Sequence, residues 1–210
     1  MKKLRPIFRF LALVSTAIST SILLPVAWSL FAPDGGFRPL FYTFLCGAAA
    51  SVALAWGGRS SVFAKMTTRE AILSVVSSWI LGSFLIGLPY FFSGSASGIL
   101  DATFEGISGF TTTGASVLLD LRTVPRGILL WRSFSRWIGG MGIIVLPLAL
   151  FPMSSSGMAV YKAERSGPSQ ERLTPRIQQT AVFLWKTYLS LTVLQTMLLL
   201  FGGLSFFDSM

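Results

Sequence analysis

Five long apolar segments, separated by shorter polar or charged stretches, make up most of the chain. They cover residues 10–31, 39–56, 71–92, 127–151 and 180–201. A bilayer core about 30 Å thick takes about 20 residues of α-helix, with a range of about 17–25, and each segment falls near that length. Lys186 stands near one end of the last segment, from where its ammonium group can reach the lipid interface. The pattern predicts an all-α integral membrane protein.

The first segment has a second interpretation, as a cleaved signal peptide. Lys2, Lys3 and Arg5 precede it, as basic residues precede the apolar region of such a peptide. That region is usually about 7–15 residues long, and residues 10–31 exceed it. The length favours a retained membrane span.

Residues 93–126 are too polar to cross a membrane and too apolar to form an ordinary loop. A Gly- and Ser-rich turn at 93–98 precedes apolar residues at helical spacing: Leu100, Phe104, Ile107 and Phe110. Asp101 stands where the N-cap or first turn of a helix favours an acid. About ten residues of helix span about 15 Å, half a bilayer, before the run Thr-Thr-Thr-Gly-Ala-Ser at 111–116. This pattern predicts a re-entrant pore loop, with a polar extracellular turn as the alternative.

The chain also carries a weak internal repeat. Placing Thr67 on Thr174 also places Arg69 on Arg176 and Asp101 on Asp208, with an apolar span between the basic and the acidic residue in both copies. We therefore expect four parts. These are two N-terminal helices in 1–66, one complete helix–pore-loop–helix repeat in 67–152, a cytoplasmic linker in 153–177, and the first helix of a truncated second repeat in 178–210.

The basic residues predict the orientation of the spans. The chain has 17 Lys and Arg against 8 Asp and Glu, scattered between the apolar runs rather than gathered on one face, which argues against a nucleic-acid partner. With the N-terminus inside, eleven fall in inner connections: Lys2, Lys3, Arg5, Arg9, Arg59, Lys65, Arg69, Lys162, Arg165, Arg172 and Arg176. Only Arg38, Arg122 and Arg126 fall in outer ones. The excess predicts a cytoplasmic N-terminus.

The residue types present argue against an enzyme. The chain has no histidine and a single cysteine, Cys46. A His-assisted nucleophile, a His-ligated haem and the usual zinc-hydrolase sites are thereby excluded for this sequence. An intramembrane hydrolase using Ser108 or Ser116 lacks a histidine partner. We expect no enzymatic activity and no cofactor.

The segment 111–116 suits the coordination of a dehydrated cation. Potassium loses its water shell only where a ring of oxygens replaces it, and backbone carbonyls are the usual source. Gly114 permits backbone angles closed to other residues, and the threonine hydroxyls can hold the loop or add oxygens. A helix ending at Phe110 would direct its partially negative end toward a cation.

The run Phe104-Glu105-Gly106-Ile107-Ser108-Gly109-Phe110-Thr111-Thr112-Thr113-Gly114-Ala115-Ser116 resembles the first pore loop of the Trk/Ktr/HKT superfamily of potassium transporters. Two further stretches resemble the bacterial Trk membrane subunit: Trp131-Arg132-Ser133 with Arg136-Trp137-Ile138-Gly139-Gly140-Met141-Gly142-Ile143, and Leu173-Thr174-Pro175-Arg176. The resemblance implies four helix–pore-loop–helix repeats around one pore. The present sequence holds one complete repeat and half of another.

The resemblance carries further expectations. It implies potassium bound by the backbone carbonyls of Thr112 and Thr113, joined by those of Thr111, Gly114 and Ala115. It implies a bacterial inner-membrane location, a cytoplasmic nucleotide-binding regulatory subunit and a homodimer, with membrane lipid around the helices. The function expected is potassium transport, and the alternative is a non-conducting structural fragment of such a transporter.

Two arginines lie within the fourth apolar segment. Arg132 and Arg136 are four residues apart and share a helix face. A structural ion pair with Glu105 or Asp120 is favoured over a barrier to ions, since charges within spans face protein or water. Nearby glycines such as Gly139 are expected to permit close helix packing.

Overall fold

The computed structural model describes residues 4–31, 34–59, 67–150 and 173–209. Every regular element in these ranges is a helix, which confirms the predicted all-α fold. The chain divides into two compact units, Met1–Gly140 and Met141–Met210.

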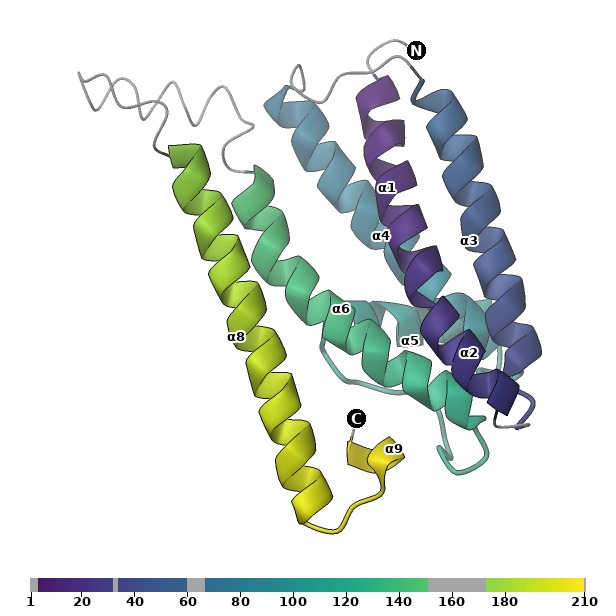
Figure 1. The fold of residues 1–210 in the computed structure, drawn as a ribbon. Coiled ribbons are helices and arrows are strands. Elements are labelled where there is room, and N and C mark those ends of the chain that lie inside the picture. Colours follow the sequence, from purple (N-terminus) through teal and green to yellow (C-terminus); the bar gives the residue numbers. More distant parts are fainter. Residues whose placement is uncertain (1–3, 32–33, 60–66, 151–172, 210) are drawn as a thin grey trace. The chain divides into compact units, whose positions relative to one another are not determined.

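The first unit contains five complete helices and the first part of a sixth (Figure 1). They are α1 (Arg5–Ser21), α2 (Leu23–Phe31), α3 (Phe37–Gly57), α4 (Thr68–Phe92), α5 (Ile99–Phe110) and α6 (Arg126–Leu150). The second unit contains the end of α6, then α8 (Leu173–Phe201) and the single-turn α9 (Phe206–Ser209).

Four of the predicted spans correspond to helices long and apolar enough to cross a membrane. They are Arg5–Phe31, Phe37–Gly57, Arg69–Phe92 and Val182–Phe201. The remaining one, 127–151, is the helix α6 over nearly the same residues. The chain is therefore a multi-pass membrane protein.

The first span is one run of helix with an interruption. Ile22 separates α1 from α2, although its amide still bonds to the Ile18 carbonyl at 3.1 Å and its own carbonyl accepts from the Val26 amide. Pro25 explains the interruption, because a proline cannot donate to the carbonyl four residues earlier, that of Ser21.

Small residues let the helices of the first unit approach closely. Ser15 Oγ on α1 donates to the Gly47 carbonyl on α3 at 3.0 Å. Where α4 meets α5, a Cβ on Gly106 would collide with the carbonyl of Ser83, and a Cβ on Gly87 with that of Ala102. The short helix α5 therefore lies backbone to backbone on α4.

This close contact determines which face of α5 is buried. Of the four apolar positions that predicted the helix, only Phe110 is buried; Leu100, Phe104 and Ile107 are 83%, 42% and 46% exposed. The opposite face is buried instead: Ala102, Glu105, Gly106, Ser108 and Gly109. The prediction of a helix is confirmed, but its inner face is the one with small and polar residues.

The segment between α4 and α6 begins and ends at the same end of the first unit. Phe92, the last residue of α4, has its ring 6.1 Å from that of Tyr42, near the start of α3. At the start of α6, the Gly127 amide donates to Asp34 Oδ2, just before α3, at 3.1 Å. Both ends thus lie beside the beginning of α3, as the count of basic residues required.

In the second unit, Asp208 has the same position in α9 as Asp101 has in α5. Asp101 is the third residue of α5 and Asp208 the third of α9. Asp208 is bonded through its amide and its carboxylate to Ser205 Oγ, at 3.2 and 2.7 Å. The subdivision into 1–66, 67–152, 153–177 and 178–210 stays a prediction, and 153–172 of the linker lie outside the described residues.

Candidate functional site

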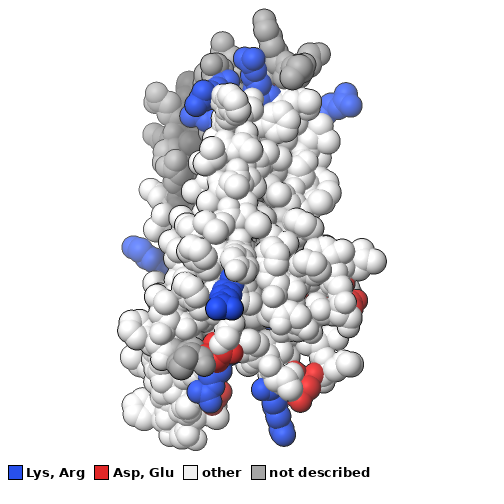
Figure 2. Space-filling view, turned by 90° about the vertical axis from the view of Figure 1, so that its right-hand side faces the viewer, with Lys and Arg blue, Asp and Glu red and all other residues white. Residues whose placement is uncertain are grey.

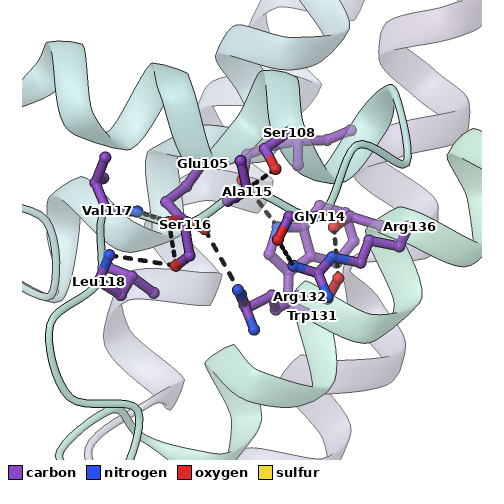
Figure 3. A network of polar contacts seen from close by, with 12 residues as sticks. Glu105, Ser108, Gly114, Ala115, Ser116, Val117, Leu118, Trp131, Arg132 and Arg136 are labelled. Atoms are coloured by element: carbon purple, nitrogen blue, oxygen red, sulfur yellow. Dashed lines mark hydrogen bonds and ion pairs between the residues drawn. The ribbon is translucent and has the colours of Figure 1, made fainter.

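The candidate site is the loop 111–117 that leaves the end of α5 (Figure 3). The end of this helix is fixed by its last residue, Phe110. The Phe110 ring lies 4.5 Å from that of Trp79 on α4, centroid to centroid. A Cβ on Gly139 of α6 would collide with the Phe110 carbonyl group. The absence of a side chain at Gly139 thus permits close packing, as predicted.

The loop has an alternating backbone conformation. Thr112 has φ 59° and Gly114 has φ 80°, while no positive φ occurs at Thr111 or Thr113. Positive φ costs a glycine nothing but is strained for a β-branched residue. The strain at Thr112 is held in place by its amide, which donates to the Gly109 carbonyl at 3.1 Å.

The amides of the loop point back to α5. The amides of Thr112 and Gly114 donate to the carbonyls of Gly109 and Ser108, the second at 3.4 Å. In a planar trans peptide the carbonyl preceding each amide points the opposite way. The carbonyls of Thr111 and Thr113 are therefore directed away from α5.

Threonine hydroxyls support this arrangement from within the loop. Thr111 Oγ1 donates to the Ile107 carbonyl at 2.7 Å and lies 2.8 Å from Thr113 Oγ1. Among the described residues, no hydrogen bond is found to the carbonyls of Thr111, Thr112 or Thr113.

The other two candidate carbonyls have partners within the chain. The Gly114 carbonyl accepts from Arg136 Nη2 at 3.4 Å. The Ala115 carbonyl accepts from Ser108 Oγ at 2.5 Å and so turns toward α5. The structure thereby separates Thr111–Thr113 from Gly114 and Ala115, which the sequence could not do.

The outgoing part of the loop is bound by the carboxylate of Glu105. Its Oε1 accepts from Ser116 Oγ at 2.6 Å and from the Val117 amide at 2.7 Å. Its Oε2 lies 3.6 Å from Arg132 Nε on α6. Figure 3 shows the carboxylate between the loop and α6. The predicted ion pair of Arg132 is thus with Glu105, whereas Asp120 bonds to the Arg122 amide at 2.9 Å.

Two further anchors were not found from the sequence. Trp131, fully buried on α6, donates from its indole nitrogen to the Ile86 carbonyl on α4 at 3.0 Å. Asp34 accepts from the Gly36 amide at 3.0 Å as well as from Gly127, so one carboxylate serves the first turns of α3 and α6. An acid just before an apolar run was the only local signal for Asp34.

No cluster of His, Cys, Asp and Glu suited to a resident metal is present among the described residues. The site offers backbone oxygens, hydroxyls and one buried ion pair. Such groups can bind and release a cation, and their place among apolar helices is compatible with a membrane protein that transports cations.

Comparison with known proteins agrees with this class. Residues 39–205 match the family model TrkH, described as cation transport protein. The chain is 38% identical over 208 residues to the Trk system potassium uptake protein TrkH of Escherichia coli K12, covering 98% of this chain and 43% of that one. It is 34% identical over 194 residues to TrkG of the same organism, covering 91% of this chain and 40% of the relative.

A solved structure is also similar. The crystal structure of the potassium transporter TrkH from Vibrio parahaemolyticus matches with a TM-score of 0.77 and 31% identity, over 98% of this chain and 41% of that one. The chain belongs to the TrkH family of cation transport proteins, and it spans about two fifths of the length of these relatives.

Proposed function

We propose that this chain contributes to potassium transport across a membrane, with the loop 111–115 supplying carbonyl oxygens to the ion. The observation that carries the proposal is the backbone of the loop. Its amides bond to α5 while the carbonyls of Thr111 and Thr113 point away and accept no hydrogen bond among the described residues. The relatives named as potassium uptake proteins support potassium as the ion.

These contacts support a carbonyl site. The carbonyls of Thr111, Thr112 and Thr113 accept no hydrogen bond among the described residues, and the family resemblance leads us to assign potassium first to Thr112 and Thr113. Gly114 and Ala115 contribute less, because Arg136 and Ser108 already donate to their carbonyls. The end of α5 adds its partial negative charge at the same place.

One loop supplies only part of an oxygen ring. About four such segments surround the ion in a carbonyl filter. We propose that further loops complete the ring, as the similarity to longer relatives suggests.

Growth of a potassium-uptake-deficient strain tests the function. Expression of the complete reading frame that contains residues 1–210 is expected to restore growth at low potassium. Uptake of potassium into these cells, measured against a vector control, gives the rate. Normal membrane insertion without any restored uptake would contradict the proposal.

The alternative is a structural membrane fragment that does not conduct. The observation in its favour is that the chain matches about two fifths of its relatives and that the described residues include one complete loop. Flux through the purified 210-residue chain, discussed below, distinguishes the two.

We further propose a bacterial inner-membrane location with a cytoplasmic N-terminus. The beginnings of α1 and α4 and the end of α3 lie at one end of the first unit (Figure 1), so Arg5, Arg59 and Arg69 gather there. On the face drawn in Figure 2, basic groups without neighbouring acids lie at that end, whereas basic and acidic groups lie together at the opposite end. Arg38 and Arg126, at the starts of α3 and α6, belong to the opposite end.

The proposed partners rest on the family resemblance. They are a cytoplasmic nucleotide-binding regulatory subunit and a second copy of the transporter, and no cofactor is proposed. Co-purification from the native membrane tests both partners, and recovery of a monomer without any companion would argue against them.

A further inference from the structure

One buried carboxylate, that of Glu105, joins three segments of the first unit. It accepts two hydrogen bonds from residues 116 and 117 of the loop and faces Arg132 of α6, while its own backbone belongs to α5. The Glu105 side chain is 1% exposed and that of Arg132 is 14% exposed. Both carboxylate oxygens of Glu105 therefore face groups of the protein rather than solvent.

Helix packing alone does not explain this arrangement. A buried charge is costly unless it is paired and hydrogen-bonded, so an acid at this place requires partners. The close approach of α5 to its neighbours is already provided by Gly106 against α4 and Gly139 against Phe110. An ion pair between α5 and α6 would need Arg132 only, yet the two shortest contacts of Glu105 go to the loop.

The positions of these contacts relative to the candidate carbonyls are informative. Ser108, three residues after Glu105 and on the same face of α5, donates to the Ala115 carbonyl. Glu105 binds the next two residues, Ser116 and Val117. Residues 111–114 therefore lie between two segments that are held in place, the end of α5 and residues 115–117.

We propose that Glu105 is a positioning residue for ion selectivity, which rests on the proposed function of the loop. By fixing residues 116 and 117, its carboxylate sets the direction of the preceding carbonyls. Selectivity depends on the number and placement of carbonyls around the ion, so a shift of the outgoing segment changes the preference for potassium over sodium. Arg132, with its Nε 3.6 Å from Glu105 Oε2, orients the carboxylate.

The chemistry of arginine separates this role from that of a structural ion pair. Exchanging the two residues, as Glu105→Arg with Arg132→Glu, preserves opposite charges on α5 and α6. Arginine has no acceptor, so it cannot receive the hydrogen bonds of Ser116 and Val117. A structural pair would be restored by the exchange, whereas a positioning carboxylate would not.

The experiment uses the complete reading frame that contains residues 1–210, reconstituted in liposomes, with the potassium-to-sodium flux ratio as the readout. Glu105→Gln keeps one acceptor oxygen but brings an NH2 group against the Arg132 guanidinium, so it loses the ion pair that orients the group. It is expected to lower this ratio about tenfold, the equivalent of about 1.4 kcal/mol. The exchange variant is expected to stay equally low. Asp101→Asn, an acid-to-amide change on the same helix in its first turn, is the matched control and should retain the original ratio.

Ser116→Ala tests the same contact from the loop, where Ser116 is exposed and removal of its hydroxyl leaves no buried cavity. Ser116→Ala should also lower the flux ratio. It therefore tests the inference independently if Glu105→Gln does not fold. An original ratio in Ser116→Ala, or one restored by the exchange variant, would overturn the inference. A wild-type protein that carries no potassium would instead contradict the proposed function.

Discussion

At the scale of single residues, the loop depends on backbone conformations that few side chains accept. Thr112 has φ 59° although it is β-branched, and Gly114 has φ 80°. Left-handed conformations cost a non-glycine residue roughly 1–2 kcal/mol. Such strain persists where the surroundings hold it, and it often marks functional segments. Here the amides that bond to α5 hold it.

Gly114→Ser is therefore expected to impair transport through the backbone alone. No atom lies within 4 Å of the place where a Cβ would stand, so the substitution causes no collision. Its strain displaces the carbonyls on either side, and we expect lower potassium uptake or a lower potassium-to-sodium flux ratio with normal membrane insertion. Uptake in the potassium-deficient strain and flux in liposomes measure this.

Gly94→Ser is the matched control for that variant. Gly94 has φ 70° and equally open surroundings, but it precedes α5 and is far along the chain from the loop. Gly94→Ser carries a similar conformational penalty, but the strain lies outside the loop 111–117. The variant should therefore leave the flux ratio unchanged. Equal ratios in both variants would remove residues 111–115 from the proposed filter.

At the scale of elements, the position of α5 depends on glycines rather than on its apolar stripe. Gly106 and Gly87 bring the backbones of α5 and α4 together, and Trp131 ties α6 to α4 through the Ile86 carbonyl. The exposed side chains of Leu100, Phe104 and Ile107 face away from these helices. The helix α5 is thus positioned by close contacts with the α4 backbone, which tolerate little change.

Gly106→Ala is expected to destabilise the first unit. In a free helix alanine is more stable than glycine by about 0.5–1 kcal/mol. Here the added methyl group would collide with the Ser83 carbonyl, and overpacking typically costs about 1–3 kcal/mol. Denaturant unfolding in detergent should show the loss. Gly98→Ala, at the N-cap of α5 with no atom within 4 Å, should lose less, because alanine there is only a poorer cap and meets no backbone. Equal stability of the two variants would refute the close contact.

At the scale of the whole molecule, the orientation of the spans follows from the basic residues at helix ends. In a Cys46→Ser background, a cysteine at Leu119, which is fully exposed in the loop before α6, should react with an impermeant thiol reagent added outside cells. Cysteines at Ser60 and Ser155, both outside the described residues, should react only after the membrane is opened. Labelling of Ser155→Cys in intact cells without labelling at Leu119 would reverse the orientation. Asp34 is unsuitable for such labelling, because its carboxylate binds Gly36 and Gly127.

The 210-residue chain by itself is expected not to form a selective pore. One loop gives about a quarter of a carbonyl ring, so four copies would have to assemble around the ion. Each copy would add α1–α3 and the long helix α8 to that ring, and in the described residues the single turn α9 follows α8. Purified chain in potassium-loaded liposomes should show no saturable flux. Potassium-selective flux from this preparation would show that a homotetramer closes, as identical subunits do in other rings.

The sequence by itself determined the helices and the place of the loop, and it left two acids, Glu105 and Asp120, as partners for Arg132. Apolar length fixes a membrane span almost independently of its neighbours, because lipid requires every backbone group to be satisfied within the helix. The half-length helix was predicted from apolar residues at helical spacing, and the loop from the polar, glycine-containing run that follows it. The rule that a charge within a span needs an opposite one predicted an ion pair with Glu105 or Asp120, and the structure shows it with Glu105.

Only the tertiary structure decided which face of α5 is buried and which carbonyls of the loop remain free. The buried face carries Gly106 and Glu105 rather than Leu100, because the distance between two backbones, not hydropathy, governs that contact. The Ala115 carbonyl turns to Ser108, and the Gly114 carbonyl meets Arg136 from a helix that follows later in the chain. Hydrogen bonds between segments distant in sequence leave no periodic pattern in the sequence. They can therefore be assigned only from the three-dimensional arrangement of the helices.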